Sequence, residues 1–233
     1  MNSSNNQKSK RYMLFARTQV LLFCGLIAGP LFMITLLIED FTKANFNPLR
    51  HPGSSLALGP FGWVQDVNFI VTGLLTLTFA VGLWRALRSP KGSSWGPFLV
   101  GCWAIGLIGA GIFPTDPILG FPPGTPDSVL HPSLHGILHD LFSVPAFLCM
   151  VIACCFVFRH WFAQRKEWAW SIYCVINGVV LAVSFALAGA GFRLVPGLVN
   201  LGGFFERIAA LVIWSWLFVI ALYFLRRIPK EDL

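Results

Sequence analysis

Residues 95–115 read WGPFLVGCWAIGLIGAGIFPT, a run of 21 residues that carries no charged side chain. A helix needs about 20 apolar residues to cross roughly 30 Å of hydrocarbon, so this run predicts a membrane-spanning helix. Five further uncharged runs of at least 18 residues occupy residues 18–38, 67–84, 141–158, 168–192 and 208–225. Backbone groups inside a bilayer must be paired within their own segment, so all six runs are expected to be helical.

The composition places the whole chain in the same class. Of the 233 residues, 56% are hydrophobic and only 12% are charged, whereas soluble domains carry about 25% charged residues. The alternating pattern of a transmembrane barrel is absent. The sequence therefore predicts an all-α integral membrane protein, a bundle of six transmembrane helices with the lipid bilayer as its main partner.

The chain is expected to form a single membrane domain over residues 18–225, between a basic tail (1–17) and a short tail (226–233). The residues before Lys8 are mostly Asn, Ser and Gln, which is typical of a disordered segment. The first apolar run is longer than a signal-peptide core and lacks a small-residue cleavage site, so we expect a retained helix. The expected spans lie at about residues 18–38, 64–84, 95–113, 137–158, 168–190 and 204–225.

The basic residues predict the orientation in the membrane, because Lys and Arg are enriched in cytoplasmic loops. Thirteen of the 17 basic residues fall on one side of the expected spans. Both termini are therefore expected in the cytoplasm, and the net charge of +7 needs no nucleic acid partner. The residues on this side are Lys8, Lys10, Arg11, Arg17, Arg85, Arg88, Lys91, Arg159, Arg165, Lys166, Arg226, Arg227 and Lys230.

Small residues inside the spans predict close helix packing, because lipid provides no hydrophobic drive for helix association. Gly25 and Gly29 form a G-x-x-x-G pattern in the first span. The third span carries glycines at positions 101, 106, 109 and 111, among others. Packing within one bundle is the leading interpretation and a dimerisation face is the alternative, so the oligomeric state stays undecided.

Polar groups concentrate on the predicted extracytoplasmic side. The densest segment holds Asp116, His135, His139 and Asp140, and a helix is expected to start at Pro132, a residue suited to the first helical position. The two histidines are four residues apart and share one helix face. Polar groups at headgroup depth are costly and often functional. The candidate binding residues are Asp66, Asn68, Asp116, His135, His139, Asp140, Glu206 and Arg207.

Three interpretations of this cluster remain open. It can form a pocket for a lipid headgroup or a small solute. It can hold zinc through His135, His139 and Asp116, which makes a metal-dependent hydrolase acting on a lipid the enzymatic alternative. It can also be structural, with polar side chains that cap helices and connect the loops.

The leading functional hypothesis is a binding protein without a cofactor, in which the cluster forms a pocket for a lipid headgroup or a small solute. The zinc-protease pattern H-E-x-x-H is absent because position 136 is Gly136. A small-solute transporter is a further alternative, although few charges lie near the middle of the spans. The sequence leaves open whether the protein is an enzyme.

Several of these residues fall in a pattern shared with a known family. The pattern includes Gly62-Trp63 with Asn68-Phe69, the segment from Gly111 to Pro117 with Phe113-Pro-x-Asp116-Pro, the two histidines and Glu206-Arg207. Over about residues 21–225 the chain resembles the bacterial membrane family called domain of unknown function 998. The resemblance implies six spans in a cell membrane, the inner membrane of a bacterium, and implies no activity.

Overall fold

Six membrane-spanning helices make up the protein, as a computed structural model shows for residues 2–87, 94–129 and 131–227. The expected fold class, an all-α bundle of six transmembrane helices, is confirmed. The six spans are Arg17–Thr42, Trp63–Ala86, Trp95–Ile112, Leu134–Gln164, Trp168–Phe192 and Gly202–Arg227. The elements are α1 (Asn2–Thr42), the 3-10 helix η1 (Gly53–Ala57), α2 (Trp63–Ala86), α3 (Trp95–Ile112), α4 (Leu134–Ile152), the π-helix η2 (Ala153–Phe158), α5 (Arg159–Gln164), α6 (Trp168–Phe192) and α7 (Gly202–Arg227).

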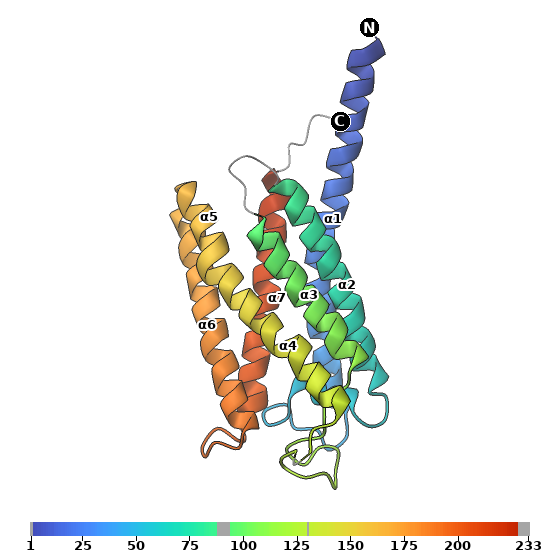
Figure 1. Cartoon of the computed structure of the whole chain (residues 1–233), viewed down its shortest axis with the longest axis vertical. Coiled ribbons are helices and arrows are strands. Elements are labelled where there is room, and N and C mark those ends of the chain that lie inside the picture. The colour runs from blue at the N-terminus through green and yellow to red at the C-terminus, as the bar shows by residue number, and fades with distance from the viewer. Residues whose placement is uncertain (1, 88–93, 130, 228–233) are drawn as a thin grey trace.

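The start of α1 and the end of α7 lie at the same end of the bundle, as an even number of spans requires (Figure 1). The opposite end carries the loops that join α1 to α2, α3 to α4 and α6 to α7, and we call it the loop end. Helices α1, α2 and α3 pack as consecutive neighbours, and α7 packs against both α1 and α6. The predicted orientation places the loop end on the extracytoplasmic side.

Helix α4 crosses the bundle obliquely (Figure 1). It starts beside α3 at the loop end, and the π-helix η2 that continues it packs against α6. An ideal Cβ on Gly178 of α6 would meet Sγ of Cys155, so the two backbones approach closely at this point. Toward the loop end α4 and α6 diverge (Figure 1).

Two helix starts differ from the sequence-based expectation. Residues 2–7 were expected to be disordered, but α1 begins at Asn2. Extending an existing helix costs far less than nucleating one, so a polar segment can continue a long apolar helix. Helix α4 was expected to start at Pro132, but it starts at Leu134 with Ser133 as its N-cap. The Ser133 hydroxyl accepts a hydrogen bond from the Gly136 N–H at 3.0 Å, which proline cannot do.

Candidate ligand-binding cavity

A cavity of about 670 Å³ lies in the loop-end half of the bundle and is lined by α1, α2, α3, α4, α6 and α7. This volume falls within the roughly 300–1,000 Å³ range of small-molecule sites. Its walls differ along the membrane normal. The side nearer the loop end is polar and includes Gln65, Thr115, His139, Asp140, Ser143, Arg193, Glu206 and Arg207. The deeper side is aromatic and includes Phe32, Phe69, Trp103, Phe147, Phe185 and Trp214.

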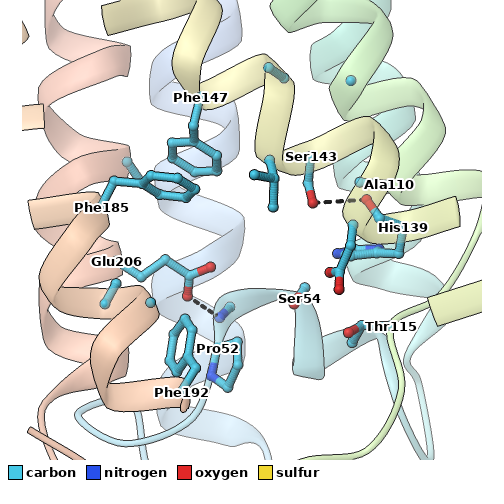
Figure 2. Close-up of a pocket in the computed structure, with 18 of the residues that line it drawn as sticks. Pro52, Ser54, Ala110, Thr115, His139, Ser143, Phe147, Phe185, Phe192 and Glu206 are labelled. Carbon is cyan, nitrogen blue, oxygen red and sulfur yellow. Dashed lines mark hydrogen bonds between the residues drawn. The ribbon is translucent and has the colours of Figure 1, made fainter. Parts of the chain in front are cut away.

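The polar and aromatic walls are separated because one helix supplies residues at different depths. On α7, Trp214 follows Glu206 by eight residues, which is about 12 Å at 1.5 Å per residue. On α4, Phe147 follows His139 by the same eight residues. The arrangement is an amphipathic chamber, polar toward the loop end and apolar toward the bundle centre (Figure 2).

Arg207 is held by a buried ion pair with Asp40 of α1. Its Nε donates to Oδ2 of Asp40 at 2.8 Å and its Nη2 donates to Oδ1 at 2.5 Å. Its Nη1 donates to the backbone oxygens of His51 and Gly203 at 3.0 and 3.1 Å. The Arg207 and Asp40 side chains are only 15% and 3% exposed. The charge of Arg207 is therefore neutralised where it lines the cavity, and its side chain connects α7 to α1 and to the loop between α1 and α2.

Glu206 offers the cavity a free carboxylate oxygen. Its Oε2 accepts a hydrogen bond from the Gly53 N–H at 2.6 Å and lies 3.8 Å from Nη1 of Arg207. Its Oε1 has no hydrogen-bond partner among the described residues. Glu206 and His139 face each other across the cavity (Figure 2). Glu206 is therefore available to a ligand that donates a hydrogen bond.

His139 joins α4 to the end of α3. Its Nδ1 lies 2.8 Å from the Phe113 carbonyl oxygen. A carbonyl only accepts, so Nδ1 carries a proton and donates this hydrogen bond. The Ser143 hydroxyl, one turn further along α4, donates to the His139 carbonyl at 2.8 Å. The cavity wall on α4 is thus built from side chains spaced four residues apart.

Asp116 and His135 lie outside the cavity. The Asp116 Oδ2 accepts a hydrogen bond from the Ser133 N–H at 2.9 Å, and an ideal Cβ on Gly136 would meet that oxygen. A carboxylate at a helix N-terminus stabilises the exposed N–H groups of the first turn. Asp116 is therefore placed as a cap for α4. The His135 side chain is exposed and packs its ring against Phe113, with centroids 5.9 Å apart.

Asp66 and Asn68 on α2 also lie behind the cavity wall. Asn68 donates from Nδ2 to Oε1 of Gln65 at 3.0 Å and to the Phe32 carbonyl at 3.3 Å. Gln65 lines the cavity, so Asn68 positions a cavity residue without reaching the cavity itself. The Asp66 Oδ1 is buried without a hydrogen-bond partner among the described residues. Of the eight candidates, the cavity is lined by His139, Asp140, Glu206 and Arg207.

The described part of the chain contains no preassembled set of zinc ligands. There, no three His, Cys, Asp or Glu side chains are grouped so that they could hold a metal ion. Of the proposed set, only His139 lines the cavity, whereas Asp116 and His135 lie outside it. A catalytic zinc needs three converging ligands, so zinc binding by these residues stays an untested prediction.

The sequence-based list missed several residues that line the cavity or support its wall. Gln65 and Ser143 were detectable, since Gln65 is three residues before Asn68 and Ser143 is four residues after His139. Residues three or four positions apart lie on the same face of a helix. Asp40 and Arg193 were not detectable in this way. Asp40 acts through Arg207, which is 167 residues away in the chain.

His51 is buried next to Arg207, and we predict that it makes the stability of the protein depend on pH. Burial lowers its pKa, and the charges of Arg50 and Arg207 act in the same direction, which outweighs a hydrogen bond to the Leu119 backbone that raises the pKa. The unfolded chain therefore binds a proton more readily, and stability should fall as the pH drops below about 6.5. When the pH is lowered from neutral to mildly acidic, the melting temperature in detergent should decrease less for His51→Gln than for wild type. His135→Gln, at an exposed site, is the control and should keep the wild-type slope, whereas equal slopes for all three proteins would contradict the prediction.

Comparison with known proteins gives a match to a family model. The model described as "Protein of unknown function (DUF998)" matches residues 26–223. No curated protein and no solved structure matches the chain.

Proposed function

The chain belongs to the DUF998 family, a family of unknown function, and from this premise we propose that it binds an amphipathic ligand in the loop-end cavity. The proposal covers a lipid or a small solute whose polar group lies at the polar wall. It rests on the cavity itself, about 670 Å³ in volume and polar on one side and aromatic on the other.

The chemistry of the two walls favours such a ligand over water alone. Water can solvate Glu206 and Asp140, but it gains little beside Trp103 and Trp214. A purely apolar molecule would cover the aromatic wall and leave a carboxylate without a partner, which is costly in a low-dielectric environment. A molecule with one polar end and one apolar end satisfies both walls.

Filling the cavity from α6 tests this proposal. An ideal Cβ on Gly189 meets nothing within 4 Å, so a larger side chain fits there without displacing the backbone. In Gly189→Phe the ring occupies ligand space, and we expect the amount of co-purifying ligand to fall about tenfold, equivalent to about 1.4 kcal/mol. Native mass spectrometry of the detergent-solubilised protein measures the bound fraction.

Gly101 on α3 provides the matched control. An ideal Cβ there also meets nothing within 4 Å, but Gly101 does not line the cavity. Gly101→Phe should therefore retain the wild-type amount of ligand. A wild-type protein without bound amphiphile, or equal occupancy in all three proteins, would refute binding in this cavity.

A further inference from the structure

The cavity reaches the surface of the bundle between α4 and α6. These helices approach each other where Phe147 and Phe185 stack, with ring centroids 4.4 Å apart and planes inclined by 14°. From that contact toward the loop end they diverge (Figure 1). Val144 on α4 and Ala186 on α6 line the cavity there, and both are exposed, Val144 by 43%. Because both helices span the membrane, this opening faces lipid.

The loop end of the cavity is covered instead. Pro52 and Gly53 are buried and line this end of the cavity, where Pro52 lies near Glu206 (Figure 2) and the Gly53 N–H donates to Glu206. Arg50 fastens this cover by joining three loops. It donates to Oδ1 of Asp127 and Oδ1 of Asn200, both at 2.8 Å, and to the Leu119 carbonyl at 3.4 Å. A ligand therefore has a more direct route from the bilayer than from the aqueous side.

The charges at the polar wall favour a cationic group. Arg207 is neutralised by Asp40, and the N–H groups that it directs to Asp40, His51 and Gly203 are already engaged. Two carboxylates then line the wall, Glu206 with a free oxygen and Asp140 beside His139. Carboxylates accept hydrogen bonds from ammonium groups and repel anions.

Arg193 supplies a positive charge at the edge of the same wall. It follows the last residue of α6, is exposed, and lines the cavity. A guanidinium recognises phosphate through paired hydrogen bonds. An ammonium and a phosphate joined in one headgroup would match the carboxylates and Arg193 together.

We propose that the ligand is a membrane lipid with a zwitterionic headgroup, in which an ammonium group is linked to a phosphate. It enters from the bilayer between α4 and α6. Its ammonium group lies at Glu206, and an acyl chain lies against the aromatic wall at Phe147 and Phe185. This inference rests on the proposed function and specifies the class and the route of the ligand.

The test compares three probes on delipidated protein by native mass spectrometry. The probes are phosphatidylethanolamine, phosphatidylglycerol with the same acyl chains, and water-soluble phosphoethanolamine. We expect about tenfold stronger retention of phosphatidylethanolamine than of phosphatidylglycerol, and no retention of phosphoethanolamine. Glu206→Gln keeps an acceptor for the Gly53 N–H but loses the charge, so the preference for the ammonium lipid should disappear. Glu167→Gln makes the same change at a carboxylate at the opposite end of the bundle that does not line the cavity, so it should keep the preference.

The outcomes separate this inference from the proposed function. Equal retention of the two lipids by wild type, or an unchanged preference in Glu206→Gln, overturns the headgroup assignment. Binding of phosphoethanolamine as tight as that of the lipid overturns entry from the bilayer and leaves a solute-binding cavity. Failure of all three probes, together with equal ligand content in wild type and Gly189→Phe, overturns the proposed function itself.

Discussion

Arg207→Ala is expected to lower the free energy of unfolding by about 3–5 kcal/mol, because it leaves the Asp40 carboxylate buried without its partner. The pair joins α1 to α7, and Asp40 is only 3% exposed. Asp40→Ala should cost a similar amount by leaving the guanidinium unpaired. Chemical denaturation in detergent, followed by tryptophan fluorescence, measures both variants.

The double variant and an exposed ion pair provide the controls. Asp40→Ala combined with Arg207→Ala removes both charges, so its cost should be clearly smaller than the sum of the two single costs. Arg227 on the same helix pairs with Glu167 at 2.7 Å but is 56% exposed. Arg227→Ala should cost about 1 kcal/mol or less. A cost for Arg207→Ala no larger than that for Arg227→Ala would show that the buried pair does not hold the helices together.

Gly73→Leu is expected to destabilise the bundle by about 3 kcal/mol, the upper end of the usual cost of overpacking. Gly73 on α2 faces α3 at very short range. An ideal Cβ there would lie 2.7 Å from Cγ1 of Ile108 and 2.9 Å from the backbone oxygen of Ala104. Side chains can rotate away, but a helix backbone cannot, so the two helices have to separate. The same denaturation experiment measures the loss.

Gly101→Leu controls for the substitution itself. Gly101 is a helical glycine on α3, the helix against which Gly73 packs. An ideal Cβ on Gly101 meets nothing within 4 Å. The glycine-to-leucine change should therefore be neutral or slightly stabilising, since glycine is a poor helix former. Equal effects at positions 73 and 101 would mean that helix propensity and not close packing determines the result.

Four of the five glycines in residues 95–115 illustrate the limit of sequence analysis. Their presence predicted close packing, and at Gly106, Gly109 and Gly111 an added Cβ would collide with a neighbouring helix, whereas at Gly101 it would not. The composition of a span indicates that small residues permit close approach. Which of them is used depends on where neighbouring helices cross, and this is not encoded within one span.

The polar cluster shows the same limit at the site. The sequence placed Asp116, His135, His139 and Glu206 at one depth, and the structure brings His139 and Glu206 together across the cavity while Asp116 caps α4. Depth follows from position along the chain, because each residue advances a helix by 1.5 Å. Which of them face the cavity depends on how α4 and α7 pack against the neighbouring helices, and these contacts join segments far apart in the chain.

The sequence by itself determined the class of the protein and the number of its spans. The bilayer acts on contiguous residues: about 20 apolar residues form a span wherever they occur, and basic loops predict its direction. Only the tertiary structure decided which side chains share the cavity and that Asp40 neutralises Arg207. Those contacts join residues up to 167 positions apart, and they exist only once the helices have packed against one another.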